Sequence, residues 1–511
     1  MKAKLPIILL IFSLIITSSC ENWLNVSSKT DIVSEEMFSD ITGFNDAVVG
    51  VYVKMAKPEL YAQEMTWRTV EFLSHQYAEV AGAPDLNVPK FLWETAPLPS
   101  KRETMWLGMY NAIANVNQIL KYQEQNRDVF KSDSFTDSLI KGEMLALRAF
   151  LHFDVMRLFG KGNLENRPEL RSAMTIPYVT DFTRIATPQR SYTATLALMK
   201  QDIQQAIQYL ECDPCRTNSS EFSTTSMSSR RFRMNYWAAK AVYARILMWE
   251  GTTESKELAL AQALEIIGNS RSGGIGTGNG AYYSWTPSSS VNQTYWYTSD
   301  LSFTQEHLFT LWVEKFIDIQ KGPTDSRSWF DCASPSNQYS VVYLTDARRN
   351  IIYEEGTGMF DSDWRANKCL WAAGASLRNW TIAKFYNVAD MGTNFSKRMP
   401  MIRVTEMYYI AAECFLAKGD RTSAVACLNK VRNQRNIPTS LNLSASLSVE
   451  DIRNEITKEY LKEFVAEGQL FFYYKRLGFS TILDYSGAMT DSEYQMPMPD
   501  SEMINGGIRV N

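Results

Sequence analysis

Apolar side chains recur at helical spacing near the end of the chain. From Val404 to Phe415 they occupy positions i, i+3, i+4 and i+7, which together form one face of an α-helix. Gly419 follows as a helix-ending residue, Asp420 can cap a second helix, and Pro438 stops that second helix. The segment is therefore predicted to be a hairpin of two helices.

The hairpin pattern also occurs earlier in the chain. Residues 237–267 carry it with Gly251 at the turn, and a weaker copy, which begins near Ser138, ends at Gly160. Repeated helix pairs with small residues at fixed places are typical of tetratricopeptide-like arrays, in which each pair buries a face only against its neighbours. The chain is therefore predicted to be all-α, a tetratricopeptide-like helix-pair superhelix of about four pairs. Trp237 is assigned to its core.

The pattern changes between about Ser270 and Met399. Helical periodicity fades there, glycine and serine increase, and tyrosine and tryptophan become dense. A stretch of this length without regular structure is uncommon in a compact domain unless it has a function. We expect a helical scaffold, mainly residues 38–270 and 400–480, that carries a large irregular aromatic-rich loop insertion at about 270–400. No convincing linker divides residues 20–511, which are predicted to form a single unit.

The first twenty residues indicate the compartment. Lys2 and Lys4 precede an apolar run over residues 5–16, which is too short to span a bilayer but fits a secretory signal. Small residues at 17–19 then lead to Cys20, an arrangement that resembles a loose bacterial lipobox. Residues 1–19 are therefore predicted to be a signal peptide and Cys20 to be lipidated, with several acyl chains holding the protein at a membrane. The alternative is an ordinary signal peptide followed by a chance cysteine.

Charge and candidate chemistry exclude several classes of function. The chain has 52 Lys and Arg against 56 Asp and Glu, without a basic tract, so it is a poor candidate for nucleic acid binding. Its three histidines, His75, His152 and His307, are too scattered for a zinc motif. The glycine-rich residues 273–280 lack the pattern of a phosphate-binding loop. No catalytic constellation is identifiable, so we expect a binding protein without a cofactor and not an enzyme.

Two smaller features leave alternatives open. Asp361, Asp363 and Asn367 could contribute oxygens to a Ca²⁺ site, although such a cation requires six or more. Cys212 and Cys215 flank a predicted tight turn, and a local disulfide or two idle thiols fit this spacing better than a redox centre does.

Several sequence motifs occur in an order that resembles the SusD/RagB family over nearly the whole mature chain. They are residues 23–26 with Gly50-Val51-Tyr52, and residues 110–115, 147–160, 400–413 and 459–478. Leu470 and Tyr473 depart from the last motif, where the family usually has Arg and Asp, which puts local packing in doubt.

Charged residues inside these motifs are interpreted as structural. Arg148 and Asp154 lie on a helix that is otherwise lined by apolar side chains, and Arg403 and Glu406 are spaced so that they can pair on one face. Polar groups inside a helical stack require partners, so ion pairs between helices are favoured over catalysis.

The resemblance implies a function and a location. A SusD-like protein is an outer-membrane lipoprotein, exposed at the cell surface, that captures oligosaccharide and delivers it to a TonB-dependent, SusC-like transporter in polysaccharide utilisation. The alternative is a RagB-like lipoprotein that takes up peptides. In both cases the expected partners are the transporter, the ligand and the membrane.

Exposed tryptophans are the candidate ligand contacts. A flat indole ring stacks on the apolar face of a sugar ring, while neighbouring polar groups bind its hydroxyls. The resemblance places such aromatics in loops, and on composition we select Trp93, Trp285, Trp296 and Trp329. For any single tryptophan, packing in the core is the alternative.

Overall fold

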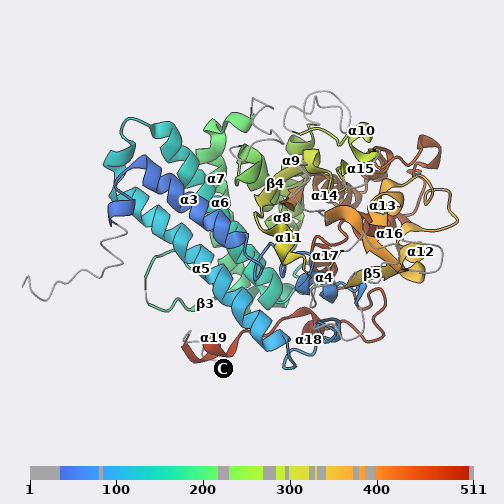
Figure 1. Cartoon of the computed structure of the whole chain (residues 1–511), viewed down its shortest axis with the longest axis horizontal. Coiled ribbons are helices and arrows are strands. Elements are labelled where there is room, and N and C mark those ends of the chain that lie inside the picture. Colours follow the sequence, from blue (N-terminus) through green and yellow to red (C-terminus); the bar gives the residue numbers. More distant parts are fainter. Residues whose placement is uncertain are drawn as a thin grey trace, which may run out of the picture.

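The helices of the scaffold contact one another in the order of the chain. The computed structural model describes residues 35–79, 85–183, 185–216, 229–268, 283–293, 298–321, 329–330, 341–371, 379–385 and 397–505. Within these residues, eight helices each pack against the next. They are α3 (Ile41–Met55), α5 (Leu98–Gln125), α6 (Ser134–Phe159), α7 (Tyr192–Tyr209), α8 (Tyr236–Glu250), α9 (Thr253–Ile267), α14 (Val404–Ala417) and α15 (Arg421–Gln434). Taken two by two they give four pairs, so the predicted all-α, tetratricopeptide-like architecture is confirmed (Figure 1).

In two of the pairs, a glycine turn joins the two helices, as expected. Gly251 between α8 and α9 has φ +71°, and Gly419 between α14 and α15 has φ +80°, a left-handed conformation that glycine adopts without steric cost. A Cβ atom at Gly251 would also lie 2.8 Å from the Cβ atom of Glu165. Asp420 caps α15 by accepting a hydrogen bond from the backbone N–H of Ser423 at 3.0 Å. The two stronger predicted hairpins are therefore present. The weaker copy differs, because Gly160 at the end of α6 has φ −92° and the chain forms two short strands before α7 begins.

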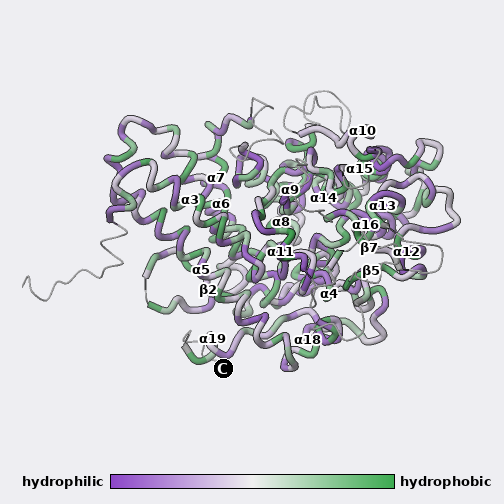
Figure 2. The backbone as a smooth tube through the Cα atoms, in the orientation of Figure 1, coloured by the Kyte–Doolittle hydropathy of each residue, from purple (hydrophilic) through white to green (hydrophobic). Residues whose placement is uncertain are grey.

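The hydrophobic core follows the middle of the helical stack. Helices α8 and α14 are buried over most of their length, whereas α3 and α7 bury only one face. Figure 2 shows polar and apolar residues mixed along α7. Trp237 on α8 is 3% exposed, and its indole N–H donates to the carbonyl oxygen of Cys215 at 3.1 Å, so its core assignment is confirmed. Cys212 and Cys215 are not bridged. No described helix is long and apolar enough to cross a membrane.

The described part of residues 283–403 contains short strands and helices, and β1 from the N-terminal part of the chain joins one of its sheets. An antiparallel sheet has the order β1-β5-β7-β6, and β4 pairs antiparallel with β8. The strands are β1 (Ala78–Glu79), β4 (His307–Trp312), β5 (Val342–Thr345), β6 (Leu370–Trp371), β7 (Asn379–Ile382) and β8 (Arg398–Arg403). The short helices are α10 (Ser288–Val291), α11 (Phe316–Ile319), α12 (Asp346–Tyr353) and α13 (Trp364–Asn367). The prediction of an irregular insertion missed this structure, because such short segments give little periodicity.

Further elements frame this region and the scaffold. A second small sheet pairs β2 (Met174–Pro177) with β3 (Gln189–Ser191). The 3₁₀ helix η2 (Val88–Lys90) precedes α5. The remaining helices named below are α4 (Thr69–Leu73), α16 (Val449–Glu463), α17 (Leu470–Leu477), α18 (Asp491–Tyr494) and α19 (Asp500–Asn505).

Buried ion pairs join the helices, as their motifs predicted. Arg148 on α6 donates to Asp202 on α7 at 2.7 Å, and Arg245 on α8 donates to Glu406 on α14 at 2.8 Å. The expected pair between Arg403 and Glu406 is wrong. The side chain of Arg403 instead extends toward α16, because both groups find buried partners on other elements.

Glu463 at the end of α16 is the centre of a larger buried network. It accepts hydrogen bonds from Arg403, from Arg435 at 2.6 Å and from Arg365 at 3.1 Å, and all four side chains are at most 2% exposed. Arg435 also donates to Glu306 at 2.6 Å. The network therefore fastens α13, β8 and α15 to α16.

Glu71 connects the end of α16 to α4. Its carboxylate accepts hydrogen bonds from the backbone N–H groups of Ala466 at 2.8 Å and Gly468 at 2.9 Å. Burial raises the pKa of Glu71 to about 8, although these two N–H groups act in the opposite direction. The segment that follows α4 is thereby held in a fixed position relative to α16.

Aromatic packing occupies the positions that depart from the last motif. Leu470 is fully buried, and the ring of Tyr473 stacks on Tyr460 with centroids 4.0 Å apart. The Tyr473 hydroxyl also lies 2.9 Å from the Thr457 hydroxyl. Apolar and aromatic contacts thus occupy these positions in place of the usual Arg and Asp, beside a cavity of about 40 Å³ that Tyr460 and Tyr473 line.

Candidate functional site

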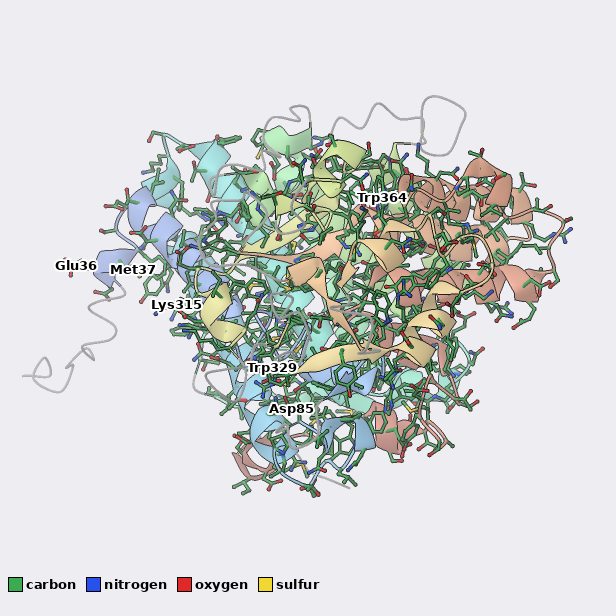
Figure 3. All side chains as sticks on the ribbon, turned by 45° about the vertical axis from the view of Figure 1, so that its right-hand side comes forward. Glu36, Met37, Asp85, Lys315, Trp329 and Trp364 are labelled. Atoms are coloured by element: carbon green, nitrogen blue, oxygen red, sulfur yellow. The ribbon has the colours of Figure 1, made fainter. Side chains whose placement is uncertain are left out.

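Trp329 lies in the core and not at the surface. It is 3% exposed, its ring lies 5.8 Å from that of Trp67, and the guanidinium of Arg68 covers it at 4.6 Å. Figure 3 shows it inside the body of the molecule, above Asp85. Because these neighbours cover its ring, Trp329 does not fit the exposed stacking role given to it from the sequence. Cys20 and Trp296 lie outside the described residues.

Trp285 is half-buried just ahead of α10. Its ring contacts Tyr408 of α14 with centroids 5.4 Å apart and Tyr283 at 6.1 Å, and the guanidinium of Arg435 lies 5.9 Å from it. This segment is at the upper edge of the molecule in Figure 1.

Trp93 is half-buried in the loop between η2 and α5. Its indole N–H donates to the carbonyl oxygen of Ser492 on α18 at 2.6 Å. Because α18 lies at the lower edge in Figure 1 and α10 at the upper edge, Trp93 and Trp285 belong to separate surfaces. The structure therefore does not bring the predicted tryptophans together into one site.

Trp93 belongs instead to a group of four rings from three segments, which we call the aromatic cluster: His75, Phe91, Trp93 and Tyr485. Phe91 contacts the other three, with centroids 5.7 Å from His75, 6.0 Å from Trp93 and 5.1 Å from Tyr485. His75 and Tyr485 are 5.2 Å apart. Trp93 and Tyr485 are half-buried, and Leu92 beside them is 44% exposed. The cluster is thus partly accessible to solvent at Trp93 and Tyr485, beside Leu92.

Two residues of the cluster, and Asp484 next to a third, have a strained backbone. Among the described residues, nine non-glycine residues have positive φ, and three of them are His75 at 60°, Phe91 at 54° and Asp484 at 55°. A side chain in this conformation costs on the order of 1–3 kcal/mol, and such residues gather at ligand-binding sites. The strain is therefore a second indication of function at the aromatic cluster.

His75 connects the two loops of the cluster. Its Nε2 lies 2.7 Å from the carbonyl oxygen of Pro89, so this nitrogen carries a proton and donates it. Burial lowers the pKa of His75, which keeps the ring neutral at pH 7. The neutral imidazole packs against both Phe91 and Tyr485, which also contact each other.

Two buried arginines hold carboxylates at the edge of the cluster. Arg102 of α5 donates to Glu94 at 2.6 Å, and Arg348 of α12 donates to Asp484 at 2.6 Å. The arginine side chains are only 4% and 11% exposed, whereas Glu94 is 74% and Asp484 46% exposed. The hydrogen bond from Arg102 lowers the pKa of Glu94, so this carboxylate is ionised at neutral pH.

Asp85 fixes the start of the loop that carries Trp93. Its buried carboxylate pairs with Arg68 and, at 3.2 Å, with Lys101 of α5. Because Arg68 also covers Trp329, the core tryptophan supports the cluster without being part of it. Buried Val88 anchors η2 in the same loop.

Among the described residues, no three or more His, Cys, Asp or Glu side chains are grouped so as to hold a metal ion. The carboxylate of Asp363, one of the proposed calcium ligands, binds Arg365 at 2.8 Å. A groove of about 660 Å³ between α7 and α9 contains none of the selected tryptophans.

Sequence reasoning found Trp93 but missed the other members of the aromatic cluster. Tyr485 lies in a short segment without a motif, and His75 was considered only as a possible zinc ligand. No spacing rule could link them, because Trp93 and its partner Ser492 are 399 positions apart.

Comparisons with known proteins agree with the architecture. Residues 22–248 match the family model described as "Starch-binding associating with outer membrane", and residues 371–505 match the one described as "SusD family". The chain belongs to the SusD/RagB family. It is 22% identical to the SusD-like protein P38 of Formosa agariphila over 477 residues, which cover 89% of this chain and 86% of that protein.

Solved structures show the same fold. A SusD superfamily protein from Bacteroides thetaiotaomicron matches with a TM-score of 0.65 and 20% identity, covering 91% of this chain and 98% of that one. A putative sugar binding protein from Bacteroides vulgatus matches with a TM-score of 0.64 and 19% identity, covering 91% and 97%.

Proposed function

We propose that this protein is a lipid-anchored, carbohydrate-binding protein of the outer-membrane surface. It captures oligosaccharide without altering it and delivers it to a TonB-dependent, SusC-like transporter. The observation that carries the proposal is the aromatic cluster, in which the partly exposed rings of Trp93 and Tyr485 lie beside anchored carboxylates. Support comes from the matching family model, described as starch-binding and associated with the outer membrane, and from the fold shared with a putative sugar binding protein from Bacteroides vulgatus.

The geometry suits a sugar. The apolar face of a pyranose ring stacks on an aromatic ring, and its hydroxyl groups donate to carboxylates at the edge. Rings that are already half-buried offer limited further contact area, so the affinity is expected to be micromolar to millimolar, on the order of 4–8 kcal/mol. Such weak binding suits a protein that passes its ligand on to a transporter.

The membrane association rests on the signal sequence of residues 1–19 and on Cys20. Lipidation at Cys20 would hold the soluble body at the membrane, where it can contact the transporter. Affinity purification of the wild-type protein from outer membranes should recover a TonB-dependent transporter, and purification of Cys20→Ala should not.

Trp285 and Trp296 are proposed as further, independent ligand contacts. Trp285 lies against Tyr408 and Arg435, at the opposite edge of the molecule from the aromatic cluster. If both surfaces bind ligand, Trp285→Ala weakens binding of long oligosaccharides and leaves the binding of short ones unchanged.

Calorimetry of the mature protein with panels of oligosaccharides and peptides tests the binding class. Trp93→Ala should weaken glycan binding about tenfold or more, because a lost stacking partner is worth on the order of 1.4 kcal/mol. Trp93→Phe is the matched control, since it keeps an aromatic face and loses only the hydrogen bond to Ser492. Binding of peptides alone would favour the RagB-like alternative.

A further inference from the structure

The aromatic cluster is built from two similar units. In each unit an aromatic residue is next in sequence to an exposed carboxylate, which a buried arginine from a helix holds by hydrogen bonds. Trp93, Glu94 and Arg102 form the first unit. Asp484, Tyr485 and Arg348 form the second.

Both ion pairs have the same orientation: the carboxylate lies toward the surface and the guanidinium lies toward the interior. Arg102 and Arg348 are 4% and 11% exposed, so a ligand at the surface meets the acids and not the bases. Asp500, which is 87% exposed, lies 3.5 Å from Arg102 and adds a third carboxylate to this edge. We call Glu94, Asp484 and Asp500 the carboxylate rim.

The sequence behind the rim is one-sided in charge. Between Gly478 and Asn505 the chain has no lysine or arginine. The same segment carries the acidic residues Asp484, Asp491, Glu493, Asp500 and Glu502. Arg102 and Arg348 compensate two of the three rim charges, which leaves one net negative charge at the rim. Lys90 on η2 is an exposed base on the facing loop.

We infer that this site selects neutral oligosaccharides and rejects anionic ones such as uronate-containing or sulfated glycans. This inference rests on the proposed function, because it specifies the ligand class of the same aromatic cluster. Ionised carboxylates are strong acceptors for sugar hydroxyl donors, so they favour a hydroxyl-rich neutral ring. A carboxylate or sulfate on the ligand would instead come within a Debye length of about 10 Å of the rim and be repelled.

The size of this discrimination follows from simple electrostatics. Two like charges about 6 Å apart in a water-like medium repel weakly, and the one uncompensated charge of the rim corresponds to about a threefold difference in affinity. The difference should shrink at high salt, because the rim is exposed and its field is screened.

The test is calorimetry with a matched ligand pair: a neutral oligosaccharide that binds, and the same oligosaccharide after oxidation of its primary C6 hydroxyls to carboxylates. We expect the oxidised form to bind about threefold more weakly at low salt. Glu94→Gln and Asp484→Asn should each reduce this ratio. Glu450→Gln is the control, because it removes an equally exposed carboxylate, 67% exposed, from α16 and should leave the ratio unchanged.

The outcomes separate the two proposals. If no neutral glycan binds in a Trp93-dependent manner, the proposed function itself fails. If a neutral glycan binds through Trp93 but its oxidised form binds equally well or better, only the charge selectivity is overturned. A ratio that neither Glu94→Gln nor Asp484→Asn changes, in variants whose melting temperatures match the wild type, also overturns it.

Discussion

Replacement of Glu463 by Gln should destabilise the protein severely although it changes only one atom of the side chain. Glu463 accepts hydrogen bonds from Arg365, Arg403 and Arg435, and none of these groups is more than 2% exposed. Burial alone would raise the pKa of Glu463, but the three guanidinium groups hold it well below its ordinary value. The carboxylate is therefore charged when folded, and Gln removes that charge from among three buried cations.

The expected loss follows from the charges that remain. Removing one member of a buried ion pair costs about 3–5 kcal/mol, because its partner stays buried without compensation. In Glu463→Gln, Arg435 still pairs with Glu306, and Arg365 still pairs with Glu459 and Asp363. Because these cations retain other partners, the loss of stability should fall near the lower end of this range, about 3 kcal/mol. Against a total stability of roughly 5–15 kcal/mol for a folded domain, this effect is large.

Urea unfolding, followed by circular dichroism, measures this difference. Glu450→Gln removes a carboxylate from the exposed pair with Arg453 on the same helix and should cost less than about 0.5 kcal/mol. If the free energy of unfolding of Glu463→Gln lies within about 1 kcal/mol of the wild-type value, the network does not fasten α13, β8 and α15 to α16. Glu463→Gln should also lower the affinity for glycan, because Glu71 links the end of α16 to the segment that bears His75.

Three further predictions concern the anchor, the core and pH. Cys20→Ala should release the protein from the outer membrane into the soluble fraction, and fractionation that finds wild-type protein soluble contradicts lipidation. Trp237→Ala should lower the free energy of unfolding by about 3–5 kcal/mol through the cavity it opens, without changing glycan affinity in the folded protein. Burial lowers the pKa of His152 to about 3 from an ordinary value of 6.5, so below pH 6.5 the unfolded chain takes up a proton that the folded protein cannot. Stability should therefore fall by up to about 1.4 kcal/mol per pH unit between pH 6.5 and 3, and His152→Gln should flatten that slope in urea titrations.

The scaffold was predictable because its signals are local. Helices α8 and α14 are long enough to show several turns of periodicity, and Gly251 and Gly419 mark their ends. The strands of the insertion have six residues or fewer, so tertiary contacts and not local pattern decide their structure.

The candidate site was only partly predictable, because burial depends on contacts distant in sequence. Trp93 and Trp329 both lie in aromatic segments and are indistinguishable by composition. Arg68 and Trp67 cover Trp329, whereas Trp93 is held at the surface by Ser492. Tyr485 joins the site through Phe91, far away in the sequence.

The partners of charged motif residues were likewise not readable from spacing. Arg403 and Glu406 are suitably spaced for a pair on one helix. Arg403 is instead the last residue of β8, and its side chain binds Glu463, which lies 60 positions away in the sequence. Spacing predicted that these residues were structural, and the fold decided with whom they pair.

The central claim is that the aromatic cluster around Trp93 binds oligosaccharide, and one measurement tests it most directly. Calorimetric titration of the wild type, Trp93→Ala and Trp93→Phe with a neutral glycan panel should give micromolar to millimolar binding in the wild type. Binding should be about tenfold or more weaker in Trp93→Ala and largely retained in Trp93→Phe, with equal melting temperatures. Undiminished glycan affinity in a folded Trp93→Ala and Tyr485→Ala double variant would contradict the claim.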